Sequence, residues 1–394
     1  TYVTLVASEL TGDQNLHEYA MQRLRAMYDH TKQTGAFTEY NSPTYTMVAL
    51  REIARMKDHV GDPDARPLID FLYRRAWEEI AWHFHAPSRQ WSGPHSRCYQ
   101  TLLPRQTLGV LERSTGLNLG ASPTRTGKLS LEDRQAIPCP PDLLSYFSGL
   151  DTPRVHRQVF IPGARPVIGT TWLAPEFSLG SVNRGDLWNQ RRPLVAYWPE
   201  MGKPASLRVR FLNNGYDFAA TRIYSSQNQG NVLAGIAFST DGGNRHVSLD
   251  KFKDATIRSS DLRLRFEFGG AAANHTIPVP ATVHSPVLLQ MGGLDIILSV
   301  PFAKLGQWEG NWEVTRTDDG VGLDLVFFHG PESAIRLDTW QTAAIGLSLA
   351  MRPASGAAMS SPTAKESGTK VALDWPQADL GITIAAKPDT GKVL

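Results

Sequence analysis

The chain has 394 residues, of which 41% are hydrophobic and 20% charged, and its formal net charge is +2. This length exceeds what one hydrophobic core usually supports, so two domains are expected. The small net charge and the lack of a Lys/Arg run argue against nucleic acid as a partner. No apolar run reaches about 18 residues, so neither a transmembrane helix nor a membrane partner is expected.

The cysteine and tryptophan content limits the possible disulfides and metal sites and indicates where the protein is located. Cys98 and Cys139 allow at most one disulfide and lack the spacing of a metal cluster. We therefore expect no required cofactor, and a structural metal is possible but not indicated. The 10 Trp and 26 Pro, together with the modest charge, are typical of an exported carbohydrate-active protein, which predicts a secreted or periplasmic location. The start at Thr1, without Met or a signal sequence, indicates a processed or trimmed chain.

Three segments of the first third repeat apolar residues at helical spacing: 16–28, 47–56 and 68–84. Before the second, Ser42 suits the N-cap and Pro43 the first helical position, which places Asn41 beside a helix N-terminus. The third helix carries Glu78 and Glu79, and both are expected on its solvated face.

From residue 100 to 160 six prolines interrupt the pattern, so this stretch is predicted to be irregular, with a domain boundary near 150. Beyond it, alternation of apolar and charged residues over 207–211 and 262–268 predicts antiparallel strands with one buried face. Further strands are predicted at 294–302, 321–329, 333–340, 345–351, 370–375 and 380–386, and 353–369 is expected to be a surface loop. The fold class is therefore α+β, with a helical (α/α)-type domain at 1–150 and an antiparallel β-sandwich domain at 151–394.

Two short blocks, 41–45 and 93–99, combine an amide, an imidazole, a guanidinium and phenols. The Asn41 amide near a helix N-terminus could hold a carboxylate, or it could simply cap the helix. His95, Arg97 and Tyr99 alternate, so in an extended stretch all three would project to one side. His95 or Tyr99 could act as a base and Tyr99 as an acid, while a loop histidine and an interface aromatic are the structural alternatives.

Candidate substrate-binding residues surround these blocks. Tyr45, one turn into its helix, could reach the same cavity as Asn41 or fill the core. Glu39 is the obvious carboxylate of the cluster.

Two regions beyond residue 150 could also contact substrate. The stretch 183–192 contains Arg184, Gln190 and Arg191 and could attract an acidic substrate, or it could be a solvated loop. His246 follows a predicted hairpin turn and could reach a cleft between the domains, with an exposed turn histidine as the alternative.

In site type and architecture, these residues resemble the polysaccharide lyases that pair an (α/α) toroid with an antiparallel β-sandwich, the alginate-lyase and heparinase-like group. The resemblance implies β-elimination on uronate-containing chains in a cleft between the domains. It places Asn41 and Arg97 at the carboxylate, His95 as base or orienter, and Tyr99 as acid or base. Two features depart from it: three predicted helices cannot close a toroid, and Ser42 follows Asn41 where some members have His.

Either an upstream helical portion is absent, leaving an incomplete toroid, or the helical layer is reduced; an oligomer or second polypeptide could supply the missing helices. The sequence thus predicts a polysaccharide lyase acting on an acidic polysaccharide or oligosaccharide. One alternative is a glycoside hydrolase, which would need Glu39 and a second carboxylate. Another is a non-catalytic protein that binds sugar through tryptophans of the β region, namely Trp188, Trp198, Trp308 and Trp312.

Overall fold

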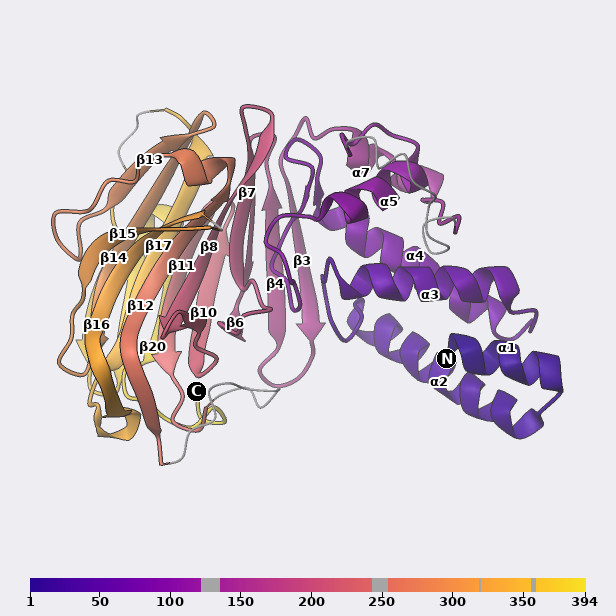
Figure 1. The fold of residues 1–394 in the computed structure, drawn as a ribbon, viewed down its shortest axis with the longest axis horizontal. Helices are drawn as coiled ribbons and strands as arrows, with labels where there is room; N and C mark the ends of the chain where they lie inside the picture. The colour runs from indigo at the N-terminus through magenta and orange to yellow at the C-terminus, as the bar shows by residue number, and fades with distance from the viewer. Residues whose placement is uncertain (122–134, 243–253, 319, 356–358) are drawn as a thin grey trace.

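The computed structural model describes residues 1–121, 135–242, 254–318, 320–355 and 359–394. Helices occupy the N-terminal part and antiparallel sheets the remainder (Figure 1), which confirms the predicted α+β class. The helices are α1 (Tyr2–Thr11), α2 (Gln14–Thr34), α3 (Tyr45–His59), α4 (Arg66–His83), α5 (Arg105–Thr115) and α7 (Ser145–Ser148). They end just before the first long strand begins at Arg154, and the division into two domains near residue 150 stays a prediction.

The three predicted helices are present as α2, α3 and α4, whereas α1 and α5 were not predicted. Helix α5 lies within the stretch expected to be irregular, because Pro104 directly precedes a helix there instead of interrupting one. Helix α3 begins at Tyr45 and not at Pro43, although the Ser42 hydroxyl oxygen still accepts the Tyr45 backbone N–H at 2.9 Å.

Apolar stripes hold the helical part together. Leu24 of α2, Leu50 of α3 and Leu72 and Trp77 of α4 are fully buried in one core. Helix α4 contacts α2, α3 and α7, and α1 also contacts α2 and α3, so these helices pack as one layer. None of the described helices is long and apolar enough to cross a membrane.

Two large antiparallel sheets form the β part. The nine-stranded sheet has the order β15-β16-β12-β8-β7-β5-β4-β3, with β9 paired to β8, and the six-stranded sheet has the order β13-β14-β17-β11-β10-β6. A three-stranded sheet, β18-β19-β20, and a hairpin, β1-β2, complete the set.

The strands of the nine-stranded sheet are β3 (Arg154–Ile161), β4 (Val167–Leu173), β5 (Ser178–Val182), β7 (Leu194–Glu200), β8 (Lys203–Asn213), β9 (Tyr216–Asp217), β12 (Thr256–Gly270), β15 (Asn311–Thr317) and β16 (Gly320–Arg336). Those of the six-stranded sheet are β6 (Arg184–Asp186), β10 (Thr221–Asn228), β11 (Asn231–Phe238), β13 (Val287–Met291), β14 (Leu294–Leu305) and β17 (Ala343–Pro353). The small sheets contain β1 (Phe84–His85), β2 (Gln90–Trp91), β18 (Thr363–Ser367), β19 (Lys370–Trp375) and β20 (Leu380–Ala385).

The two large sheets share one apolar core, as a sandwich requires. Leu207, Val209 and Phe211 point into it, as their alternation predicts. The intervening Arg208 and Arg210 lie on the other face, where both pair with Glu267 at 2.5 Å.

Several strand predictions need correction. The predicted strands 321–329 and 333–340 are one strand, β16, which ends at Arg336. Strand β18 lies within the predicted loop 353–369, because residues 363–367 pair with β19. The predicted hairpin turn and His246 lie outside the described residues. Cys98 and Cys139 are both free and buried.

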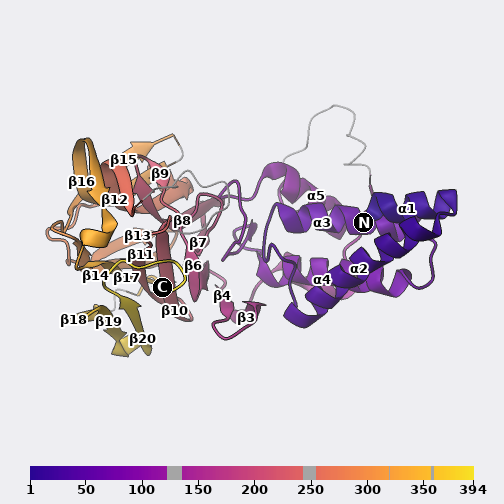
Figure 2. The same cartoon turned by 90° about the horizontal axis from the view of Figure 1, so that it is seen from below.

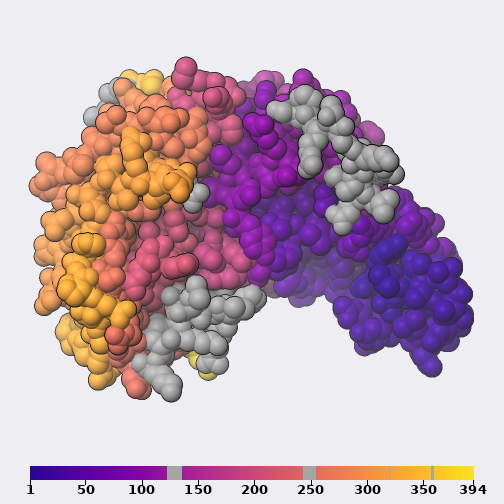
Figure 3. Space-filling view, in the orientation of Figure 1, coloured from indigo at the N-terminus to yellow at the C-terminus, as the bar shows by residue number. Residues whose placement is uncertain are grey.

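Strand β3 and the neighbouring loops join the helices to the nine-stranded sheet (Figure 2). The rings of Tyr40 and Phe160 stack with centroids 4.0 Å apart, and the Gln158 amide donates to the Gly35 carbonyl at 2.6 Å. The junction is so close at Gly180 that an added Cβ would lie 1.9 Å from the Gly93 carbonyl oxygen. The helices project from the β part, and the outline is concave beneath them (Figure 3).

Candidate functional site

The two predicted blocks do meet in space, and Asn41 lies at the centre of their contact. Its backbone has a φ of 41°, in the left-handed region that Asn tolerates better than most residues. Its side-chain amide donates to the carbonyls of Ser92 and Pro94 at 2.9 and 2.8 Å, and its Oδ1 accepts from the Trp91 indole at 2.6 Å.

Asn41 is 0% exposed, and all of its amide donors are used by backbone carbonyls. A substrate carboxylate could reach this amide only if at least one of these bonds broke and the loop opened. The geometry therefore does not support the direct contact with a carboxylate that the sequence suggested. Instead, the hydrogen bonds of Asn41 connect the loop at residue 41 to the segment 91–94.

His95 is also enclosed, with 2% of its surface exposed. Its Nδ1 lies 2.9 Å from the Asn41 carbonyl oxygen, which can only accept, so Nδ1 carries the proton. Its Nε2 lies 3.4 Å from the Tyr197 hydroxyl, which donates to the Thr101 carbonyl. Burial lowers the pKa of His95 to about 4, so the imidazole is neutral at physiological pH.

The expected alternation of His95, Arg97 and Tyr99 on one face does not occur. Only His95 forms a bridge in this stretch, to Arg192, and the residues after it are irregular. His95 therefore points inward while Tyr99 is 54% exposed.

A second cluster lies at the surface and joins Tyr45, Tyr99, Arg97 and Trp188. The Tyr45 and Tyr99 hydroxyls are 2.8 Å apart, and an Arg97 Nη atom donates to the Tyr45 hydroxyl at 3.3 Å. The Arg97 guanidinium lies 5.0 Å from the ring centres of both Tyr45 and Trp188. The structure thus brings Tyr45, Arg97 and Tyr99 together, and for Tyr45 it favours the surface cluster over the core position that the sequence also allowed.

The two phenols differ in acidity. The hydrogen bond from Tyr45, and then Arg97, lower the pKa of Tyr99 below its ordinary value. The same hydroxyl contact raises the pKa of Tyr45. Tyr99 is therefore the phenol of the pair that loses its proton more easily, and its exposure leaves it accessible to a ligand.

An arginine-lined hollow of about 380 Å³ adjoins this cluster, and Arg97 belongs to both. Glu39 and Tyr40 line it from the helical side, and four further arginines line it from the β side: Arg165, Arg184, Arg191 and Arg222. Glu39 is the one carboxylate among its lining residues, so positive charge dominates the hollow.

A buried carboxylate pairs with two of these arginines, Arg191 and Arg222. Asp186 is 0% exposed and accepts from Arg191 at 2.6 Å, while an Arg222 nitrogen lies 3.7 Å away. Arg97 and Glu39 form a looser pair at 3.6 Å. Arg184 and Arg191, which the sequence singled out, both line the hollow, and their contact with substrate stays a prediction. Arg165 and Arg222 were not singled out, because they lie far apart in the sequence and come together only in the folded protein.

Gln190 does not line the hollow. Its backbone carbonyl accepts the Cys98 N–H at 2.6 Å, so it ties the stretch 183–192 to the second block. Among the described residues no group of three or more His, Cys, Asp or Glu side chains is placed to hold a metal ion.

Glu79 is the residue that sequence reasoning misplaced. It is 1% exposed, and its Oε1 accepts the Asn41 backbone N–H at 2.8 Å. The signal was present, because Leu72, Ala76, Glu79 and His83 follow helical spacing along the buried side of α4. Glu78, by contrast, pairs with Arg74 and Arg75 and is 15% exposed.

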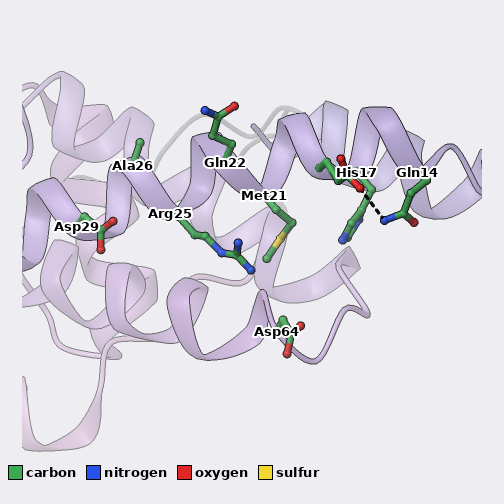
Figure 4. A pocket seen from close by; sticks show the side chains of 9 residues that line it. Gln14, His17, Met21, Gln22, Arg25, Ala26, Asp29 and Asp64 are labelled. Atoms are coloured by element: carbon green, nitrogen blue, oxygen red, sulfur yellow. Dashed lines mark hydrogen bonds between the residues drawn. The ribbon is translucent and has the colours of Figure 1, made fainter.

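Another hollow, of about 540 Å³, lies along α2. Figure 4 shows His17, Met21 and Arg25 of α2 pointing toward the turn that carries Asp64. The one imidazole there is paired with Asp62 at 2.9 Å. None of the predicted site residues lines this hollow.

Comparison with known proteins gives little more. No protein-family model and no curated protein matches the chain. Among solved structures, the crystal structure of heparinase III is similar at 10% sequence identity, with a TM-score of 0.41 over 97% of this chain. This chain spans 66% of the heparinase III chain.

Proposed function

We propose that this protein is a polysaccharide lyase that cleaves a uronate-containing acidic polysaccharide by β-elimination. The observation that carries the proposal is the Tyr45–Tyr99 hydroxyl pair, 2.8 Å apart, next to Arg97, which also lines the arginine-lined hollow. The hollow supplies charge for an acidic chain, and the tyrosines supply groups that move protons.

In the proposed reaction, the Tyr99 phenolate removes the proton alpha to the uronate carboxylate. The electron pair of that C–H bond forms the new carbon–carbon double bond as the bond from the beta carbon to the glycosidic oxygen breaks. The departing oxygen takes a proton from Tyr99 or Tyr45. Arg97 neutralises the carboxylate, whose charge grows as the alpha proton leaves, and such electrostatic stabilisation is usually the largest catalytic contribution.

Asn41 and His95 have supporting roles in this proposal, since both are buried and engaged with backbone groups. Arg184 and Arg191 bind acidic groups of the chain, while Glu39 orients Arg97. A secreted or periplasmic location stays a prediction from composition.

A hydrolase has less support. It needs two carboxyl groups flanking the scissile bond, and Glu39 is the one carboxylate among the residues that line the hollow. A binding protein without catalysis would need the arginines but not the phenol pair.

The test follows the ultraviolet absorbance of unsaturated uronate products on a panel of alginate, glucuronan, ulvan, heparin-type and pectic chains. With the substrate so identified, Tyr99→Phe is expected to lower kcat by a factor of about 10² to 10⁴, because it removes the proton-transfer group. Activity of the unaltered protein should rise with pH as Tyr99 loses its proton. Tyr216→Phe is the matched control, since Tyr216 is 63% exposed on β9.

Full activity of Tyr99→Phe would remove Tyr99 from the mechanism. New reducing ends without a rise in absorbance would favour the hydrolase. Binding of an acidic chain without either product would favour the non-catalytic alternative.

A further inference from the structure

Glu79 connects the helical core to the loop that carries the site. Its side chain points from α4 to residue 41, and its Oε1 accepts the Asn41 backbone N–H at 2.8 Å. Its Oε2 is buried and makes no hydrogen bond of standard geometry among the described residues, although the nearby Gln158 amide favours its charged form. A buried carboxylate with one oxygen that lacks a standard hydrogen bond is costly, which singles out this contact from the ordinary polar contacts of the fold.

The contact acts on the residue that sets the shape of the loop. Asn41 has a φ of 41°, and Ser42 follows directly. The Ser42 hydroxyl donates to the Arg97 carbonyl at 2.7 Å and accepts the Tyr45 N–H at 2.9 Å. A continuous series of bonded groups therefore runs from Glu79 through Asn41 and Ser42 to Arg97 and Tyr45.

We propose that Glu79 is a positioning residue, whose ionised carboxylate fixes the Asn41 turn and thereby aligns Tyr45 and Arg97 with Tyr99. It touches none of the groups that would react, so it acts through the loop. This inference rests on the proposed lyase function for its kinetic consequence, while the loop contact itself can be measured separately.

The surroundings make Glu79 the group of this buried region that titrates near neutral pH. Burial raises its pKa to about 7, against the opposing effects of the Asn41 N–H, Arg75 and Gln158. The histidines around it stay neutral, because burial lowers the pKa of each: His83 on α4, His156 on β3, and His95 in the second block.

The experiment uses the whole protein and its variant Glu79→Gln, which preserves size and an oxygen acceptor but cannot ionise. The Trp91 indole N–H bonds to Asn41 Oδ1 and therefore reports on the turn. The NMR signal of this indole N–H is assigned in tryptophan-labelled protein by its disappearance in Trp91→Phe. In the unaltered protein its chemical shift is expected to change around pH 7, a change called the indole step below. In Glu79→Gln the indole step should be absent. Because a charged acceptor roughly doubles the strength of a hydrogen bond, kcat/KM of the variant should be about tenfold lower above pH 7 and converge with the unaltered protein below it.

Glu112→Gln is the matched control, because Glu112 also accepts backbone N–H groups, those of Leu119 and Ala121, at a loop away from the site. It should keep both the indole step and kcat/KM. If the indole step persists in Glu79→Gln, ionisation of Glu79 does not control the Asn41 turn. If the indole step is lost but kcat/KM is unchanged, Glu79 has no positioning role in catalysis. If the unaltered protein turns over no chain of the panel, the lyase function fails, and the indole step alone still decides whether Glu79 controls the turn.

Discussion

Replacing Asn41 separates a structural role for its amide from a direct role in catalysis. Asn41→Ala removes three buried side-chain hydrogen bonds and leaves the Trp91 indole and two backbone carbonyls unpaired. Each unpaired buried group costs about 1–3 kcal/mol, and because the three share one loop we expect about 3–5 kcal/mol in total. Alanine at a φ of 41° adds about 1 kcal/mol of backbone strain.

Asn41→Gly loses the same hydrogen bonds but not the strain, so it should be about 1 kcal/mol more stable than Asn41→Ala. The free energy of unfolding is measured by urea titration, following the helical circular dichroism signal. Asn214 provides the matched control, since it also has a positive φ of 52° but is exposed. Asn214→Ala and Asn214→Gly should differ from each other by a similar amount, with a much smaller loss relative to the unaltered protein.

An Asn41→Ala protein within about 1 kcal/mol of the unaltered one, yet inactive, would refute this reasoning. Such a result would mean that the buried hydrogen bonds contribute little to stability. It would return the amide to direct contact with the substrate carboxylate, as the sequence suggested.

Two further predictions concern the buried carboxylate of Glu79 and the arginines that line the hollow. The pKa of Glu79 is about 7 in the folded protein against 4.5 for a free glutamate, so the folded state holds an extra proton between these values and loses stability as pH rises through them. Between pH 5 and pH 8 the unfolding free energy of the unaltered protein should therefore fall by about 3 kcal/mol more than that of Glu79→Gln. Parallel plots of unfolding free energy against pH for the two proteins would contradict this. Arg184→Gln should weaken binding of the acidic chain about tenfold and reduce its salt dependence, measured by titration calorimetry at two salt concentrations, whereas Arg258→Gln on the distant strand β12 should change neither.

The sequence predicted the fold class because its signals are local. Helical spacing identified α2, α3 and α4, and alternation identified the core-facing side of β8, since both patterns depend only on neighbouring residues. The same locality explains the errors: Pro104 was interpreted as a breaker although it precedes a helix, and β16 was divided in two.

For the candidate site, too, the sequence predicted some features and the tertiary structure decided others. Residue types alone identified the blocks around Asn41 and Tyr99, and these blocks do meet. Only the tertiary structure decided which side chains face inward, because the 92–99 stretch is irregular and alternation does not apply to it. Long-range packing placed Asn41 and His95 in the interior, left Tyr99 exposed, and buried Glu79 beneath the loop, since burial depends on partners more than thirty residues away along the chain.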